Sequence, residues 1–245
     1  MSPASLSAAT TAPEGLAAAL AGCGHAVLAP GEFARFAGAT LPELDALRPS
    51  WETLPPDAHM RDGGRYRRRR HASFIVDGAE LRLVPQRAHW QPIEYNALHG
   101  GLERWFEPID AAVLALPAWR RILLAFAGLA STLRGEQPWF VEAHQFRIDT
   151  TDGIGRPTPE GAHRDGVDFV AVILVGREGI KGGETRVFAA EGADGKRFTM
   201  LEPWTTLVLD DARVIHESTP IQPLEGYGHR DTLVLTYRAG SFQGP

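Results

Sequence analysis

Two periodicities of apolar residues occur along the chain, one typical of helices and one typical of strands. In residues 117–134, apolar side chains from Trp119 through Phe126 to Leu133 recur at near-helical spacing, and Gly135 follows as a stop signal. This segment is the clearest helix in the sequence. Shorter helices are predicted at residues 13–22, 30–38 and 42–54.

The remaining apolar segments have the length and composition of strands. Residues 65–76 and 80–84 flank Asp77-Gly78, a dipeptide that favours a tight hairpin. Further strands are predicted at residues 139–148, 169–175, 185–188, 198–201, 206–209, 214–217 and 232–238. Short strands separated by Gly and Pro are typical of a sandwich, barrel or jelly roll. We therefore expect a mainly β fold with flanking α-helices.

The chain shows no internal repeat, and nothing between residues 60 and 240 resembles a linker. A chain of 245 residues is long enough to form a full core, since folding at this size removes roughly 70–75% of the surface of the unfolded chain from water. We expect residues 1–60 to form an N-terminal helical extension that packs on a β domain formed by residues 61–245.

Composition and charge exclude several classes of protein. The single cysteine, Cys23, excludes an internal disulfide framework and a cysteine-based zinc site. The formal net charge of −5 gives no global attraction to nucleic acid or to an anionic membrane. The first basic residue is Arg35, and no apolar run is long enough to cross a bilayer. We expect a cytoplasmic protein without a membrane partner, whose oligomeric state the sequence does not specify.

Three residues carry the most specific chemical signal. His163 and Asp165 are two apart at the start of an apolar strand, so their side chains point to the same face of an extended chain. One imidazole and one carboxylate are two-thirds of the facial triad that non-haem Fe(II) oxygenases use. His216 follows a later strand and could supply the third ligand. Taken alone, such a pair is more often formed by solvated loop residues, and a lone histidine such as His216 is more often a hydrogen-bonded core residue.

Arg230 follows these three residues in the sequence, at a position where its side chain is expected to be buried near His216. Arg230 begins an apolar strand, with Thr232 on the same face, and a hairpin through residues 226–228 is expected to return it to the neighbourhood of His216. A buried guanidinium needs an anionic partner, because burying an unpaired charge is costly. The carboxylate of a ligand, bound through two parallel hydrogen bonds, is such a partner.

The combination of H-x-D, a distal His and R-x-T resembles the Fe(II)/2-oxoglutarate-dependent dioxygenases. Residues 159–169, 182–185 and 230–236 are similar to a bacterial subfamily that contains L-isoleucine hydroxylase and related free-amino-acid hydroxylases. The resemblance covers roughly residues 60–240 and is most specific in residues 138–238. It implies a double-stranded β-helix, a cupin-like jelly roll, for the β domain.

The resemblance also implies roles for individual residues. His163, Asp165 and His216 would ligate Fe(II), and 2-oxoglutarate would chelate the metal through its 1-carboxylate and 2-keto oxygen. The 5-carboxylate would pair with Arg230, with the Thr232 hydroxyl assisting. O2 would take the remaining position, 2-oxoglutarate would be decarboxylated to succinate, and a C–H bond of a small molecule would be hydroxylated. The implied substrate is a free aliphatic L-amino acid, and no residue beyond the metal centre is needed as a general base.

The strand that precedes H-x-D is expected to form a wall of the pocket. His144 or Gln145 is therefore predicted to touch the ligand, with Gln145 assigned to the cosubstrate, although a structural hydrogen-bonding role is an equal alternative. Arg147 is a candidate for the substrate carboxylate, and Glu142 and Asp168 are candidates for its amine.

Residues 65–71, Arg-Tyr-Arg-Arg-Arg-Arg-His, form a basic strand with three interpretations. It could be a solvated surface, it could lend an Arg to a substrate carboxylate, or it could bind nucleic acid or phosphate. The last interpretation leaves open a nucleic-acid or nucleotide demethylase of the same superfamily, which the acidic net charge disfavours. A third possibility is a non-enzymatic regulatory β-helix protein related to biofilm or motility. The complete ligand set together with Arg230 weighs against that possibility.

Overall fold

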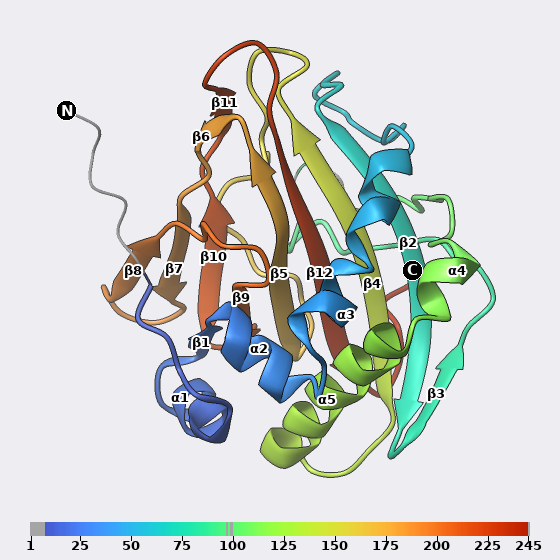
Figure 1. Ribbon diagram of the computed structural model, residues 1–245. Helices are drawn as coiled ribbons and strands as arrows, with labels where there is room; N and C mark the ends of the chain where they lie inside the picture. The colour runs from blue at the N-terminus through green and yellow to red at the C-terminus, as the bar shows by residue number, and fades with distance from the viewer. Residues whose placement is uncertain (1–7, 97, 99, 245) are drawn as a thin grey trace.

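The larger of two facing sheets contains seven antiparallel strands (Figure 1). The computed structural model describes residues 8–96, 98 and 100–244. The strands of this sheet follow in the order β1 (His25–Leu28), β9 (Thr206–Asp210), β5 (Phe169–Glu178), β12 (His229–Ala239), β4 (Trp139–Asp149), β2 (Arg67–Asp77) and β3 (Glu80–Leu83).

Shorter strands form the opposing layer. A three-stranded sheet contains β10 (Val214–Ser218), β7 (Thr185–Ala189) and β8 (Gly195–Phe198), and β6 (Ile180–Gly182) pairs with β11 (Ile221–Pro223). From β5 onward the chain crosses repeatedly between the larger sheet and this layer. Strands that alternate between two layers in this way form a jelly roll. The predicted mainly β fold with flanking helices is therefore confirmed.

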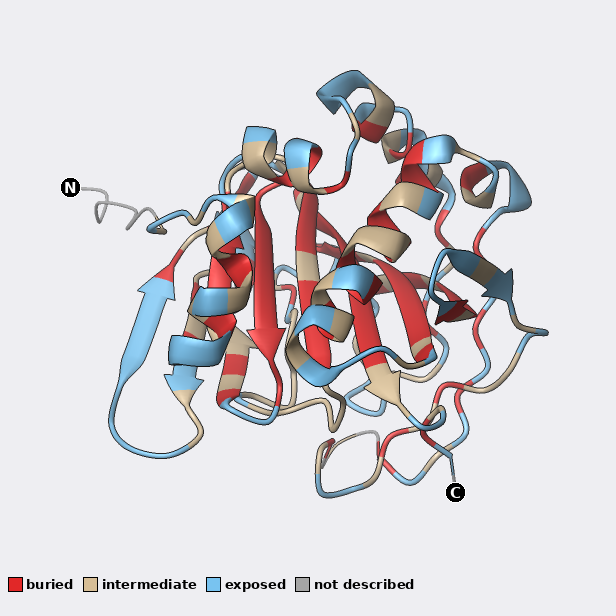
Figure 2. Cartoon of the chain, turned by 90° about the horizontal axis from the view of Figure 1, so that it is seen from below, coloured by how far each residue is buried: buried red, intermediate tan, exposed pale blue. Residues whose placement is uncertain are grey.

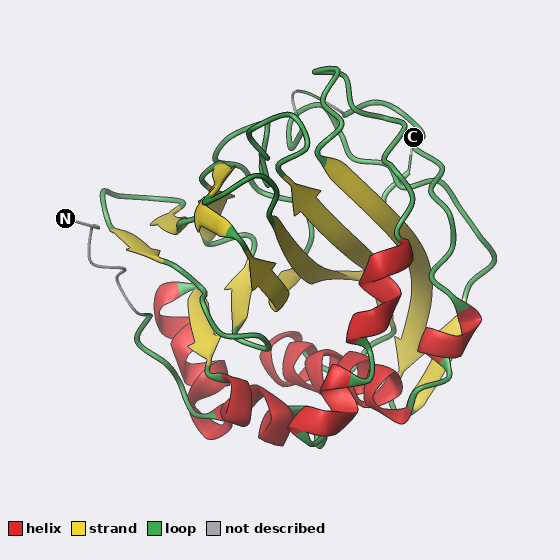
Figure 3. Ribbon diagram, turned by 45° about the horizontal axis from the view of Figure 1, so that its top comes forward, coloured by secondary structure: helices red, strands yellow, loops and turns green. Residues whose placement is uncertain are grey.

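Helices cover one face of the larger sheet (Figures 1 and 3). The 18-residue helix α5 (Pro117–Arg134) has the predicted bounds, and it buries Trp119, Ile122 and Phe126 in a core shared with the strands. The other helical segments are η1 (Pro13–Gly15), α1 (Leu16–Cys23), α2 (Pro30–Phe36), α3 (Leu41–Asp45), η2 (Arg48–Thr53) and α4 (Ala111–Leu114). Figure 2 shows the buried residues concentrated between the helices and the strands beneath them.

The N-terminal segment is more than the helical extension that the sequence predicts. Within its described part, β1 pairs with β9 and forms an edge of the larger sheet, and Leu16, Leu28 and Leu44 are fully buried in the main core. Residues 1–7 lie outside the described residues. The described part of residues 1–60 therefore packs on the core of the β domain and adds a strand to its larger sheet.

Several local predictions differ from the structure. The strand predicted at residues 198–201 ends at Phe198 as β8, and β6, β11 and α4 have no predicted counterpart. The predicted hairpin from His216 to Arg230 is wrong, because β10 pairs with β7 and the chain forms β11 before it enters β12. The hairpin at Asp77-Gly78 is confirmed. No helix in the described part of the chain is long and apolar enough to cross a membrane.

Candidate metal and cosubstrate site

A cavity of about 130 Å³ lies between the two layers of strands. The period-two alternation of strands determines which side chains reach it. Glu142, His144, Phe146 and Ile148 of β4 line the cavity, as do Arg230, Thr232, Val234 and Thr236 of β12. The residues between them face the helical layer. The segment before β5 and strand β10 complete the wall with His163, Asp165 and His216.

The three predicted metal ligands are brought together in the structure. His163 Nε2 lies 3.9 Å from one carboxylate oxygen of Asp165, and His216 Nε2 lies 3.8 Å from the other. The two imidazole rings are 4.7 Å apart between centroids. Two imidazole nitrogens and one carboxylate around a shared space are the donor set that suits non-haem Fe(II). The residues present therefore fit this metal.

Hydrogen bonds orient the ligand atoms. Nδ1 of His163 lies 2.9 Å from the carbonyl oxygen of Gly161, and this bond leaves Nε2 directed to the shared space. The Asp211 carboxylate accepts the backbone N–H groups of Asp165, Gly166 and Val167, at 2.8–3.2 Å, which fixes the backbone at the second ligand. The loop that carries Asp165 is therefore held in place by a buried carboxylate.

The charge around the ligands favours a cation. Burial and the neighbouring Asp165 carboxylate raise the pKa of Asp211 to about 7. Burial acts to lower the pKa of His163, but Asp165 and Glu160 outweigh it and raise this pKa above its ordinary value. Burial, reinforced by His163, lowers the pKa of His216 to about 4, so this imidazole is neutral at pH 7. A divalent cation would relieve the repulsion between the carboxylates and replace the proton on His163.

Gln91 belongs to the site but was not singled out in the sequence. Its amide Nε2 donates to Asp165 Oδ1 at 3.2 Å, while its Oε1 accepts hydrogen bonds from Asn96 and Arg104. These two donors fix the orientation of the amide and direct its N–H group at the carboxylate of Asp165, a candidate metal ligand. The residue lies in an irregular segment, where neither periodicity nor a motif marks it.

Arg230 is suited to bind an anion. Its side chain is buried in the cavity wall, and its Nη2 has no hydrogen-bond partner among the described residues. Burial lowers the pKa of this guanidinium to about 10, and the nearby Arg177 contributes in the same direction. Thr232 lines the cavity two residues further along the same face. A carboxylate of the cosubstrate would satisfy the unpartnered N–H groups of Arg230.

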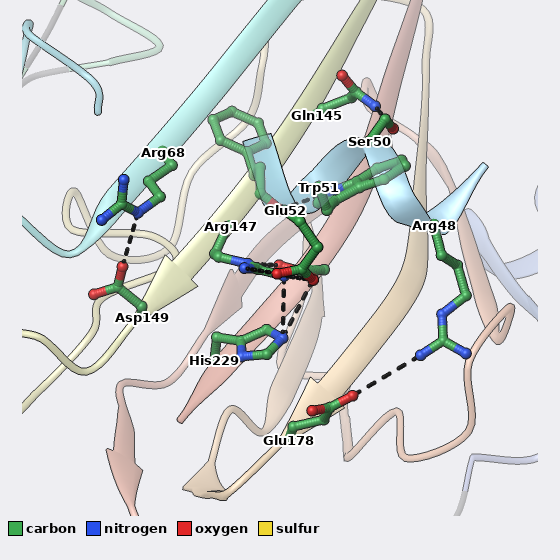
Figure 4. A network of polar contacts seen from close by, with 12 residues as sticks. Arg48, Ser50, Trp51, Glu52, Arg68, Gln145, Arg147, Asp149, Glu178 and His229 are labelled. Atoms are coloured by element: carbon green, nitrogen blue, oxygen red, sulfur yellow. Dashed lines mark hydrogen bonds and ion pairs between the residues drawn. The ribbon is translucent and has the colours of Figure 1, made fainter. Parts of the chain in front are cut away.

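The structure contradicts the prediction that Gln145 binds the cosubstrate. Gln145 is fully buried on the face of β4 opposite the cavity, and its Nε2 donates to Ser50 Oγ at 2.7 Å (Figure 4). Arg147 is on that face too, where it pairs with Asp231 and Glu52 at 2.7 Å and is not free for a substrate. Which of two adjacent strand residues faces the cavity depends on the register of the strand. In this structure the residue of β4 that lines the cavity is His144, and not its neighbour Gln145.

The basic strand divides as its alternation predicts. Arg67 and Arg69 are buried and line the cavity, whereas Arg68 and Arg70 are partly exposed and pair with acidic residues on the other side. The inward face therefore does not form a surface patch for nucleic acid. The interpretation that this strand contributes cations to a small-molecule pocket is the one that the structure supports.

A second polar cluster lies deeper in the same part of the molecule. His71, His89, Glu142 and His144 offer ligand atoms within 4.8 Å of one another, so they could also hold a metal ion. Glu142, however, already accepts from Arg87 at 2.9 Å, and His144 Nδ1 is 2.9 Å from Nη2 of Arg69. Two guanidinium groups in contact with the cluster oppose the entry of a dication. The donor set at His163 carries no such cation.

Solved structures share this fold. A bsmA homolog from Methylobium petroleophilum PM1 is 52% identical, with a TM-score of 0.93 and 98% of each chain covered. IDO from Bacillus thuringiensis has a TM-score of 0.76 at 18% identity, covering 95% of this chain and 100% of that one. The Fe(II)/α-ketoglutarate-dependent dioxygenase TqaL has a TM-score of 0.72 at 19% identity, covering 94% and 91%. None of the curated proteins matches the chain.

The family comparison agrees with the geometry of the site. The 2OG-Fe dioxygenase profile matches residues 48–236, which include the three candidate metal ligands and Arg230. Its match begins before the predicted boundary at residue 60, in the segment that packs into the core. The chain therefore belongs to the 2OG-Fe dioxygenase family, and it is an oxygenase that uses Fe(II), 2-oxoglutarate and O2.

Proposed function

We propose that this enzyme hydroxylates a small molecule, a free L-amino acid with an aliphatic side chain, in the cavity between the two layers. The observation that carries the proposal is the convergence of two anchors on one buried cavity. One is the set His163, Asp165 and His216, and the other is the guanidinium of Arg230, whose Nη2 has no hydrogen-bond partner among the described residues. Together they match the needs of a metal and of a dicarboxylate cosubstrate.

The residues of the chain have distinct tasks in this proposal. His163, Asp165 and His216 hold Fe(II), and Gln91 orients the carboxylate of Asp165. Arg230 binds the 5-carboxylate of 2-oxoglutarate, which orients the cosubstrate toward the metal. When bound, iron supplies the oxidising chemistry with O2, and 2-oxoglutarate is converted to succinate and CO2.

The apolar part of the cavity wall favours an aliphatic substrate group near the metal. Val167, Val172 and Val234 line the cavity, and they exclude water from the region where a C–H bond must be held. The similarity of residues 159–169 and 182–185 to free-amino-acid hydroxylases supports the same substrate class. Membership in an oxygenase family supports an enzyme over a purely regulatory β-helix protein.

A substrate screen tests the proposal. The enzyme is incubated with Fe(II), 2-oxoglutarate, ascorbate and each of the standard L-amino acids, and succinate and a product heavier by one oxygen atom are quantified. We expect matched formation of both with an aliphatic amino acid. Faster turnover of blocked amino acids, peptides or methylated oligonucleotides would disprove the substrate class and leave the iron and cosubstrate assignments intact.

A further inference from the structure

Two buried guanidinium groups in the cavity wall have no acidic partner in the described part of the chain. Arg69 of β2 and Arg104, from the loop that follows β3, are 3% and 2% exposed, and neither forms an ion pair there. The Nε atoms of both are buried without a hydrogen-bond partner. Both side chains line the same cavity as the metal ligands. Each side chain therefore has at least one N–H donor without an acceptor, and both lie in the wall of a space that is open to a ligand.

The other buried ions nearby are matched. Arg67 pairs with Asp57 at 2.7 Å, and Glu142 accepts from Arg87, His71 and His89 at 2.9–3.2 Å. The carboxylates of Asp57 and Glu142, the acidic groups whose charges act on Arg69, thus already have partners, and Arg69 and Arg104 add positive charge at this end of the cavity. An unpaired charge is costly to bury, so an anionic ligand is the expected occupant.

The surroundings of Arg69 hold its guanidinium in a fixed plane. It lies over the ring of Phe106 at 3.9 Å and over that of Phe146 at 4.6 Å, and its Nη2 is 2.9 Å from Nδ1 of His144. Arg104 Nη2 donates to Gln91 Oε1 at 2.9 Å. Burial lowers the pKa of Arg104 to about 10, with Arg67 adding to this effect and Asp57 and Glu160 opposing it. Burial, together with Arg104, lowers the pKa of Arg69 as well, so an anionic ligand would stabilise the charged form of both guanidinium groups.

A carboxylate oxygen without a donor lies near Arg104. Glu160 lines the cavity, and its Oε2 is buried without a hydrogen-bond partner among the described residues, while its Oε1 is 3.5 Å from His163 Nε2. Glu142 was an earlier candidate for the amine of a substrate, but its oxygens are occupied. Asp168 was another, but its Oδ2 accepts the backbone N–H of Ala239, and it does not line the cavity. Glu160 is thus the better acceptor for an ammonium group.

We propose that Arg69 and Arg104 bind the carboxylate of the substrate and that Glu160 accepts its ammonium group. The three residues form a zwitterion anchor that is separate from Arg230, which binds the cosubstrate. This inference rests on the proposed function, and it selects free α-amino acids over amines, amides and N-acylated amino acids. Two guanidinium groups present several N–H donors to one carboxylate of the ligand. An amidated amino acid carries no negative charge at this position and cannot form the same ion pairs.

Binding measurements with Mn(II), a redox-inert substitute for Fe(II), test the anchor without turnover. The protein is loaded with Mn(II) and 2-oxoglutarate, and the standard L-amino acids are titrated by calorimetry. The best binder is then compared with its analogue that lacks the amine and with its analogue that lacks the carboxylate. We expect the analogue without the amine to retain measurable affinity, because it keeps its carboxylate. The analogue without the carboxylate should not bind measurably.

Variants assign the two halves of the anchor. Arg69→Met should weaken amino-acid binding by about 10²-fold and leave the dissociation constant of 2-oxoglutarate unchanged. Arg69 is preferred over Arg104 because Arg104 also holds Gln91. Arg70→Met, on the outward face of the same strand, is the matched control and should bind like the wild type. Glu160→Gln should weaken the binding of the amino acid but not the binding of its analogue that lacks the amine.

Thermal unfolding provides a second readout that needs no ligand. Because Arg69 lacks an acidic partner, Arg69→Met should keep or raise the Tm, whereas Arg67→Met should lower it by stranding the buried Asp57. A loss of 2-oxoglutarate affinity in Arg69→Met, or unchanged amino-acid affinity in it, would overturn the anchor. So would a wild type that binds Mn(II) and 2-oxoglutarate but none of the amino acids. Failure to bind Mn(II) and 2-oxoglutarate would instead contradict the proposed function.

Discussion

The imidazole rings of His163 and His216 lie side by side because of one backbone bridge. The N–H of each residue donates to the carbonyl of the other, at 3.0 and 2.9 Å, so the two residues stand directly opposite each other. Asp165 follows in the irregular segment before β5 and lies on the same side, with its Oδ1 3.9 Å from His163 Nε2. At the residue scale, the sequence predicted this set from spacing and resemblance, whereas the cross-strand bridge that unites it is visible only in the fold.

The metal should depend on the three ligands together. Replacing His216 by Ala leaves two protein ligands, which are too few to hold iron firmly, and His163→Ala or Asp165→Ala should behave alike. We expect each variant to lose most of its bound iron and its succinate formation while keeping the wild-type Tm of the metal-free protein. Metal analysis after anaerobic loading checks this. Stoichiometric iron in His216→Ala would refute the assignment.

Metal affinity should fall at acidic pH. The pKa of His163 is raised in the metal-free site by Asp165 and Glu160, against the effect of burial, so a proton competes with the metal at this imidazole. Affinity should be full above this raised pKa and fall about tenfold per pH unit below it. Titrations with Mn(II) from pH 8 to pH 5.5 measure the slope. A flat profile over this range would show that His163 Nε2 does not bind the metal.

Arg230 should govern the affinity for 2-oxoglutarate but not that for the metal. Arg230→Ala removes the partner of a buried carboxylate, which costs roughly 3–5 kcal/mol, or about 10²–10⁴-fold in binding. Arg230→Lys should restore only part of this, because an ammonium lacks the planar fork. Calorimetry of the Mn(II)-loaded variants checks both statements. Unaltered affinity in Arg230→Ala would show that the cosubstrate carboxylate is bound elsewhere.

At the scale of elements, β4 shows what a sequence leaves undetermined. The strand was predicted nearly to its bounds, but Trp139–Asp149 is buried on both faces, so its hydrophobic pattern does not mark which residues face the cavity. Gln145 was assigned to the ligand and His144 left as an alternative, and the register with β2 and β12 reversed that choice. Gln91 escaped prediction because it lies outside any strand.

A pair of glutamine variants tests this division between faces. Gln91→Leu removes the hydrogen bond to Asp165 and should weaken metal binding by about 10–100-fold. Gln145→Leu removes a bond to Ser50 on the opposite face and should leave metal and 2-oxoglutarate affinities unchanged while lowering the Tm. The comparison is made by Mn(II) and 2-oxoglutarate titration. Equal effects of the two variants on metal affinity would mean that the faces are not separated as described.

At the scale of the whole molecule, the N-terminal segment is part of the main core. Helix α5 was predictable because its apolar positions repeat over 18 residues. Strand β1 was not, since four residues without a flanking motif acquire strand structure only by pairing with β9, nearly 180 residues away in sequence. Propensity is weak for such a segment, and the tertiary context decides.

Removing residues 1–47, so that the chain begins where the family match begins, should therefore abolish cooperative folding. The deletion removes β1 and exposes the apolar surface that Leu16, Leu28, Phe33 and Leu44 cover. Burial of one such side chain contributes roughly 1.5–3 kcal/mol, so the four together contribute about as much as the usual net stability of a whole domain. Thermal unfolding followed by circular dichroism measures the effect. A sharp transition near the wild-type Tm would show that residues 1–47 are not needed for the core.

The position of the metal is the central claim, and a crystal structure of the protein grown with Mn(II) and 2-oxoglutarate tests it most directly. The anomalous difference map should show one peak at about 2.0–2.3 Å from His163 Nε2, His216 Nε2 and an oxygen of Asp165, with the far carboxylate of 2-oxoglutarate on Arg230. A peak among His71, His89, Glu142 and His144 instead would contradict the account.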